Sequence, residues 1–189
     1  MHRQMYTVAV QLKVRRATNT DIPEVVRVIR AVYDEYSFPW EPEGYHADLY
    51  DLETHYDQEG DFFYVAELNG EVIGTAALEV FPPVPGASSV ESIEGYWRVS
   101  GADCSLERLY VHPDYRRVGA GRALLDHVIE QATNLNRARM ELWSDKKFLE
   151  AHRLYEGYGA VVVGERLCDD PDQSPEWGLR IDLVPKAQS

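Results

Sequence analysis

Cysteine is scarce in this sequence of 189 residues, and long apolar runs are missing. Cys104 and Cys168 form no CxxC pair, which is typical of free thiols in a reducing compartment; a disulfide between them is the alternative. No stretch approaches the roughly 18 apolar residues that a membrane-spanning helix needs, and the N-terminal segment lacks the cleavage site of a signal peptide. We therefore expect a cytoplasmic protein with no membrane partner.

Motifs for three common kinds of site are absent as well. The sequence has no G-K-[ST], so the phosphate loop that holds a nucleotide with magnesium is missing. It has no G-x-G-x-x-G, because Leu124 stands where the third glycine would fall. The six histidines include no HExxH or similar pair, so we predict no metal site.

Positive charge is in deficit. The chain has 19 Lys and Arg residues against 32 Asp and Glu residues, a net charge of −13. Such a surface repels phosphate backbones and attracts cations, so nucleic acid is not an expected partner and an amine substrate is favoured. The alternative is that the acidic charge only keeps the protein soluble.

What is present predicts one folded domain over residues 1–189, with a core at about 12–184 and flexible tails at 1–7 and 185–189. Helical and strand periodicities alternate along the chain. Thr20 is the expected N-cap of the first helix, and Asn69-Gly70 predicts a tight hairpin turn. Helices are expected at 21–33, 47–56, 119–133 and 148–156, and strands at 8–14, 62–68, 71–81, 105–111, 139–143, 160–166 and 177–183. Residues 82–103 are expected to form a long loop, and 168–176 an acidic surface connection.

A basic turn with two glycines precedes the helix expected at 119–133. Arg116, Gly119 and Gly121 form R-x-x-G-x-G after the strand LERLYV. The first turn of a helix has unpaired N–H groups and a partial positive charge, and glycine lets a phosphate approach them. The pattern predicts a pyrophosphate site; the alternative is a purely structural turn.

The segment LERLYVHPDYRRVGAGRALL, followed by a strand and then AHRLYEGYGA, resembles the GCN5-related N-acetyltransferase (GNAT) superfamily from about Lys13 to Leu183. The resemblance implies an α/β (α+β) fold in which helices flank a mixed sheet of six to seven strands and the fourth and fifth strands splay apart. It implies an enzyme that uses acetyl-CoA as cosubstrate without a metal. By the same resemblance, the pantetheine arm lies along Leu109, Tyr110 and Val111. Arg116 belongs to the binding signature, and the pyrophosphate loop comprises Arg117, Val118, Gly119, Ala120, Gly121 and Arg122.

Two residues are implied as catalytic. Tyr155 matches the tyrosine that donates a proton to the departing thiolate, which its reference pKa of ~10 permits; the alternative is a packing role. Glu107 is the candidate base, and strict alternation along its strand would place it on the face of Leu109 and Val111. An ion-paired Glu107, or direct loss of the amine proton to water, is the alternative.

One position departs from the pattern of the family. Many relatives have asparagine seven residues before the helix tyrosine, where this chain has Phe148. The asparagine helps to hold the cofactor, so this contact is missing or supplied by Ser144 or Asp145.

The sequence determines the acceptor less closely than the cofactor. In this fold the loop between the first two helices and the loop before the fourth strand wall the acceptor site. We expect Phe38, Trp40 and Tyr45 from the first to bind substrate, with Tyr96 and Trp97 in the second; hydrophobic plugs or a dimer surface are the alternative. The expected reaction is acetyl transfer to a primary amine of a small or amino-acid-like molecule. Acetylation of a protein lysine or N-terminus, and a non-catalytic acyl-CoA-binding module, are the alternatives. Pairing of two copies through the late strands is a further expectation.

Overall fold

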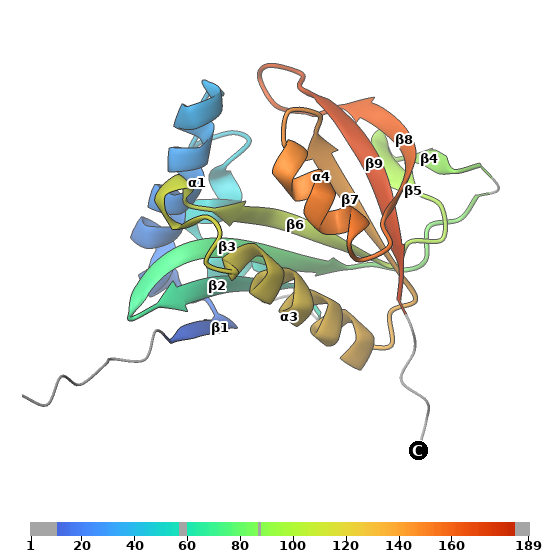
Figure 1. The fold of residues 1–189 in the computed structure, drawn as a ribbon. Coiled ribbons are helices and arrows are strands. Elements are labelled where there is room, and N and C mark those ends of the chain that lie inside the picture. The colour runs from blue at the N-terminus through green and yellow to red at the C-terminus, as the bar shows by residue number, and fades with distance from the viewer. Residues whose placement is uncertain (1–10, 57–59, 87, 184–189) are drawn as a thin grey trace, which may run out of the picture.

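A seven-stranded mixed sheet forms the centre of the computed structural model, which describes residues 11–56, 60–86 and 88–183 (Figure 1). The spatial order is β1-β2-β3-β6-β7-β9-β8, with β6 and β7 parallel and the other neighbours antiparallel. The strands are β1 (Leu12–Arg16), β2 (Phe62–Leu68), β3 (Glu71–Val80), β6 (Cys104–Val111), β7 (Arg139–Asp145), β8 (Val161–Leu167) and β9 (Pro175–Asp182). The predicted fold class and mixed sheet are confirmed.

Helices cover both faces of this sheet (Figure 1). The helices are α1 (Ile22–Tyr36), α2 (Leu52–Tyr56), α3 (Ala120–Asn134) and α4 (Leu149–Glu156), with 3₁₀ turns at Asn19–Asp21, Ala47–Tyr50 and Pro113–Tyr115. The apolar stripe of α1 packs with α2 on one face. Leu124, Leu125 and Val128 of α3 and Tyr155 of α4 share the core of the other face. The site described below lies between these two layers.

β6 and β7 pair only at their starts. Cys104, Ser105 and Leu106 lie opposite Met140, Glu141 and Leu142, and no further pair follows among the described residues. The edge of β6 that faces β7 therefore has no ladder partner from Glu107 onward, and its backbone groups need another partner. These are the fourth and fifth strands of the main sheet, so the predicted splay is confirmed.

A β-bulge in β6 reverses the expected direction of Glu107. Glu107 pairs with Ala77 and Tyr110 pairs with Thr75, so three steps along β6 match two along β3. Arg108 within the bulge has φ 52°, and its carbonyl accepts a hydrogen bond of 2.8 Å from Thr75 Oγ1. Because the extra residue shifts the alternation, Glu107 shares a face with Tyr110. The prediction that it shares a face with Leu109 and Val111 was wrong.

The long loop expected at 82–103 contains a hairpin, β4 (Val90–Ile93) with β5 (Tyr96–Val99). Glu94 and Gly95 form its turn, both with positive φ, which suits a tight two-residue hairpin. The hairpin lies beside β8 and β9 (Figure 1). The segment expected to form a long loop thus contains two strands, each only four residues long.

Most other predicted elements are confirmed to within a few residues. The Asn69-Gly70 turn has both residues at positive φ, as the sequence predicted. Thr20 is not the N-cap of α1: Asp21 holds that position, and Thr18 caps the preceding 3₁₀ turn. β1 begins at Leu12, later than expected. Residues 8–10, where the strand was expected to start, lie outside the described residues, as do both predicted tails. Both cysteines are free and buried.

Candidate functional site

Two neighbouring cavities occupy the splay between β6 and β7. The smaller, about 260 Å³, runs from β6 to the start of α3 and the inner side of α4. Nine of the ten residues predicted to bind the cofactor line it, and Val118 does not: Leu109, Tyr110, Val111, Arg116, Arg117, Gly119, Ala120, Gly121 and Arg122. The sequence prediction therefore identified one continuous surface, assembled from a strand edge and a helix start.

The turn before α3 is shaped to leave backbone donors free. Arg117 and Gly119 have positive φ, and Gly119 is the N-cap of α3 with no side-chain capping bond. The N–H groups of the first turn thus have no partner within the helix. A Cβ at Gly119 would meet nothing within 4 Å, so the protein leaves open space there. These features fit an anionic group such as a pyrophosphate.

Gly121 leaves space beside this turn, and Arg116 is held beside it by an ion pair. A Cβ at Gly121 would lie 3.6 Å from side-chain carbons of Val111 and Leu154, both of which line the smaller cavity. Packing against these two side chains would therefore tolerate a Cβ at position 121. Glycine at this position instead keeps the smaller cavity open. Arg116 forms an ion pair with Glu35 of α1, which fixes its guanidinium beside the groove.

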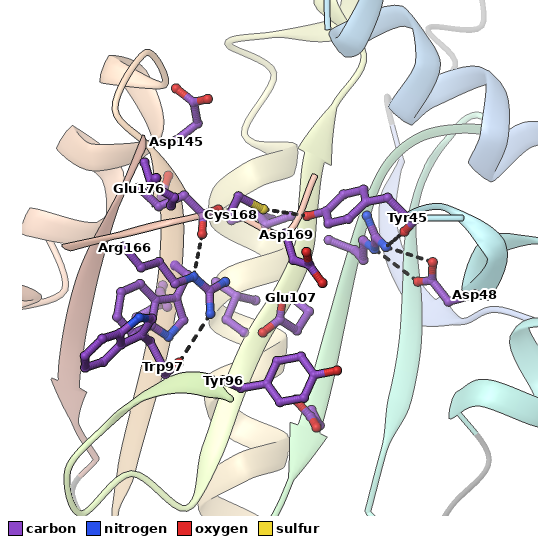
Figure 2. Close-up of a pocket in the computed structure, with 18 of the residues that line it drawn as sticks. Tyr45, Asp48, Tyr96, Trp97, Glu107, Asp145, Arg166, Cys168, Asp169 and Glu176 are labelled. Atoms are coloured by element: carbon purple, nitrogen blue, oxygen red, sulfur yellow. Dashed lines mark hydrogen bonds and ion pairs between the residues drawn. The ribbon is translucent and has the colours of Figure 1, made fainter. Parts of the chain in front are cut away.

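The larger cavity has a volume of about 1180 Å³. Three segments far apart in the sequence wall it: the loop 44–48 after α1, the tip 94–97 of the β4–β5 hairpin, and 166–176 at the ends of β8 and β9 (Figure 2). Leu109, Tyr110, Phe148 and Tyr155 line both cavities. A reaction between molecules held in the two cavities would take place at these four residues.

Glu107 lies on the floor of the larger cavity, where the strands part. Its Oε1 accepts a hydrogen bond of 2.5 Å from Ser105 Oγ. Burial raises the pKa of Glu107 to about 7, and Glu79 of β3 adds to this, while the Ser105 bond, Arg166 and Arg108 oppose it. A carboxylate with such a pKa can accept a proton near neutral pH.

Tyr155 of α4 is buried at the junction of the cavities. Burial raises the pKa of its hydroxyl above the ordinary value, and Tyr110 and Glu107 add to the shift. The hydroxyl is therefore protonated at neutral pH and can donate a proton. Glu107 and Tyr155 are thus close enough for the charge of Glu107 to affect the pKa of the Tyr155 hydroxyl.

Arg108 fixes the loop that walls the larger cavity. Its guanidinium donates to both carboxylate oxygens of Asp48, at 2.7 and 3.0 Å, and to the carbonyl of Tyr45 at 2.8 Å. The same guanidinium lies over the Tyr45 ring, and Cys168 Sγ donates to the Tyr45 hydroxyl. Tyr45, one of the three residues predicted to bind substrate, is therefore held in the cavity wall.

Phe38 and Trp40, the other two, line neither cavity. Trp40 stacks on His46, with ring centroids 3.9 Å apart, and Phe38 packs against Tyr33, Tyr36 and Phe148. Phe148, where many relatives have asparagine, joins this aromatic cluster and lines both cavities. Ser144 and Asp145 line the larger cavity and not the smaller one.

Several residues of the site had no signal in the sequence. Arg108 and Asp48 are sixty positions apart, and Arg166 reaches Glu176 of the neighbouring strand at 2.7 Å. The acidic connection 168–176 does join β8 to β9, but Cys168, Ser174 and Glu176 are buried and Asp169 lines the larger cavity. It is part of the site rather than only a surface connection.

Comparison with known proteins agrees with this geometry. The model of the acetyltransferase (GNAT) family matches residues 26–160. The chain belongs to this family. It is accordingly an acetyl-CoA-dependent N-acetyltransferase, and its reaction needs an amine acceptor.

Individual relatives extend the comparison. The N-acetyltransferase YjgM of Escherichia coli, itself uncharacterized, is 31% identical over 148 residues, covering 77% of this chain and 79% of the relative. N-acetylaspartate synthetase of Danio rerio is 31% identical over 121 residues, 64% of this chain but only 37% of the relative. The structure of YncA from Salmonella typhimurium, solved with its cofactor acetyl-CoA, superimposes with a TM-score of 0.68 at 18% identity, covering 94% of this chain and 96% of that one. At 18% identity, the comparison with YncA shows that the two proteins share a fold.

The described residues of the acetyltransferase lack two further features. None of its described helices is long and apolar enough to span a bilayer. Within the same residues, no three His, Cys, Asp or Glu side chains gather in a way that could hold a metal ion.

Proposed function

We propose that this acetyltransferase transfers the acetyl group of acetyl-CoA to a primary amine of a small, cationic molecule held in the larger cavity. The observation that carries the proposal is the charge of that cavity. Eight carboxylates line it, against two arginines: Asp48, Asp61, Glu79, Glu94, Glu107, Asp145, Asp169 and Glu176 against Arg108 and Arg166. Both arginines are paired with carboxylates of the same cavity, and Arg98 pairs with Glu79 from outside it. The carboxylates that have no such ion pair give the cavity a negative field that attracts a cation.

The smaller cavity is the proposed site of acetyl-CoA. The unpartnered edge of β6 can pair with the amides of a pantetheine arm, and the free N–H groups at the start of α3 can bind the pyrophosphate. Arg117 and Arg122 add positive charge, and Gly119 and Gly121 leave the necessary room. Phe148 supplies apolar contact in place of the polar one that asparagine gives in many relatives.

Glu107 is the proposed base and Tyr155 the proposed acid. Bound acetyl-CoA supplies the acetyl group as a thioester. Glu107 accepts a proton from the acceptor ammonium, directly or through water, and the free amine nitrogen forms a bond to the carbonyl carbon. The carbon–sulfur bond breaks, and Tyr155 donates its proton to the departing sulfur. The nitrogen then releases its second proton, which returns to the Tyr155 oxygen directly or through water. The products are an N-acetylated amine and a free thiol.

The walls of the larger cavity support a small acceptor over a protein. Loop 44–48, the β4–β5 hairpin and the 166–176 segment surround it on three sides, whereas a protein chain needs a groove that is open along its length.

A panel of acceptors tests the proposal. We expect small primary amines to release thiol from acetyl-CoA, with kcat/KM at least ~10-fold above that for peptides with a free N-terminus or a lysine, because a peptide meets the walls of the cavity. The measurement is thiol release on the purified protein. Acetylation of the peptides alone would show that the acceptor is a protein.

A hydroxyl deletion tests Tyr155. Tyr155→Phe should lower kcat by about 10-fold without changing the Kd for acetyl-CoA. The effect is moderate because a thiol of ordinary pKa (~8.5) is already a good leaving group. Tyr64→Phe, at a tyrosine that is as buried as Tyr155 and lines neither cavity, is the matched control. An unchanged kcat in Tyr155→Phe would leave the residue only a packing role.

A further inference from the structure

The tip of the β4–β5 hairpin places two aromatic side chains at the mouth of the larger cavity. Tyr96 is 62% exposed and Trp97 is 44% exposed, and both line the cavity with Glu94 and Gly95 of the turn. Figure 2 shows the Tyr96 ring, the Glu107 carboxylate and the Asp169 carboxylate around the same open space. The exposed ring therefore faces the route by which an acceptor reaches the proposed base.

The hairpin is fixed rather than loosely attached. Glu141, a fully buried carboxylate of β7, accepts hydrogen bonds from Arg98 Nη1 at 2.8 Å and from the Val99 N–H at 2.6 Å. Arg98 also forms an ion pair of 3.3 Å with Glu79 of β3. These bonds join β5 to two strands of the main sheet, so the position of Tyr96 is defined before any acceptor binds.

A second set of contacts holds the other side of the hairpin. Arg166 of β8 donates to the Trp97 carbonyl at 3.3 Å. A Cβ at Gly164 would lie 2.7 Å from a methyl carbon of Val90, so glycine allows β4 to pack directly against β8. The hairpin is thus built into the wall of the cavity.

The size and charge of the cavity indicate what the tip contacts. A volume of about 1180 Å³ far exceeds that of one amino group with a few carbons, since pockets of ~300–1,000 Å³ hold drug-sized molecules. The cavity therefore has room for an acceptor that extends well beyond a reacting nitrogen at Glu107. Along its path lie an aromatic ring and the carboxylates of Glu94 and Asp169, and this combination favours a cation over an apolar or anionic group.

We propose that Tyr96 is a specificity-determining residue that binds a second cationic group of the acceptor, so that the preferred substrates are diamines or longer polyamines. This inference rests on the proposed function, because it assumes that the reacting amine lies at Glu107. One amino group is acetylated there. The distal ammonium contacts the Tyr96 ring, and Glu94 and Asp169 supply the opposing charge.

A pair of acceptors of equal length tests the inference: 1,4-diaminobutane and 1-aminobutane. On the wild-type protein we expect kcat/KM for the diamine to exceed that for the monoamine by about 10-fold at low salt, and the ratio to shrink as ionic strength rises. Tyr96→Ala should lower kcat/KM for the diamine by about 5-fold and leave the monoamine unchanged. Tyr96→Phe, which keeps the ring, should retain the preference.

The controls separate this inference from the function on which it rests. Val162→Ala removes an exposed side chain of β8 that lines neither cavity, and it should leave both rates unchanged. Because the monoamine rate is measured on each variant, a folding defect would lower both rates together. Equal rates for the two amines on the wild-type protein would overturn the inference and leave the proposed function standing. Failure of every small amine on a protein that binds acetyl-CoA would overturn the proposed function itself.

Discussion

Glu107→Gln should lower kcat/KM for amine acetylation by about 10²- to 10⁴-fold, the usual contribution of a general base, without weakening acetyl-CoA binding. Wild-type activity should rise with pH through about 7, the pKa to which burial and Glu79 bring this carboxyl, because only the ionised form accepts a proton. The variant should lose this rise. It should keep the rise at higher pH that comes from the acceptor amine, whose own pKa is ~10.

The stability of the same variant provides an independent check. A raised pKa means that folded Glu107 keeps a proton that the unfolded chain, with an ordinary carboxyl pKa near 4.5, has released. The free energy of unfolding therefore falls as pH rises from about 4.5 to 7. At pH 8 Glu107→Gln should be more stable than wild type, by up to about 3 kcal/mol, and the difference should vanish below pH 4.5. Urea unfolding at several pH values measures it.

Glu130→Gln is the matched control for both measurements, because it removes one carboxylate from the exposed side of α3, outside both cavities. A Glu107→Gln enzyme with wild-type activity and an unchanged pH profile would show that the amine loses its proton elsewhere.

Gly119→Glu should weaken acetyl-CoA binding by at least about 100-fold. The new carboxylate would lie where the pyrophosphate is proposed to bind, and two like charges about 4 Å apart repel by about 4 kcal/mol at an effective dielectric near 20. Calorimetric titration with acetyl-CoA measures the loss, and activity should fall in parallel at limiting cosubstrate.

The chain offers a close control for this variant in Gly70→Glu. Gly70 has φ 89° and Gly119 has φ 91°, and a Cβ at either would meet nothing within 4 Å. Both substitutions thus carry the same backbone strain, but Gly70 lies in the β2–β3 turn, away from both cavities. Wild-type affinity in the Gly119 variant would place the pyrophosphate elsewhere; equal losses in both variants would mean that strain, rather than charge, is responsible.

Local signals in the sequence determined the elements that form the smaller cavity. The R-x-x-G-x-G turn combines a helix start, left-handed glycine geometry and nearby arginines within seven residues, and it predicted a pyrophosphate site from local residues. The resemblance to the GNAT superfamily then implied the individual residues, nine of which line this cavity. The β2–β3 hairpin followed in the same way from Asn69-Gly70. In each case the information lies in neighbouring residues, because backbone conformation at a turn depends mainly on the residues within it.

Tertiary structure decided the larger cavity and the direction of Glu107. The bulge at Arg108 depends on Asp48, Tyr45 and Thr75, which lie 33 to 63 positions away, and nothing in LERLYV indicates it. The β4–β5 hairpin owes its place to the buried Glu141 and to the missing side chain at Gly164. Such contacts form only when distant segments pack together, so the sequence determined that this protein binds acetyl-CoA, and the packing of distant segments decided the walls of the larger cavity.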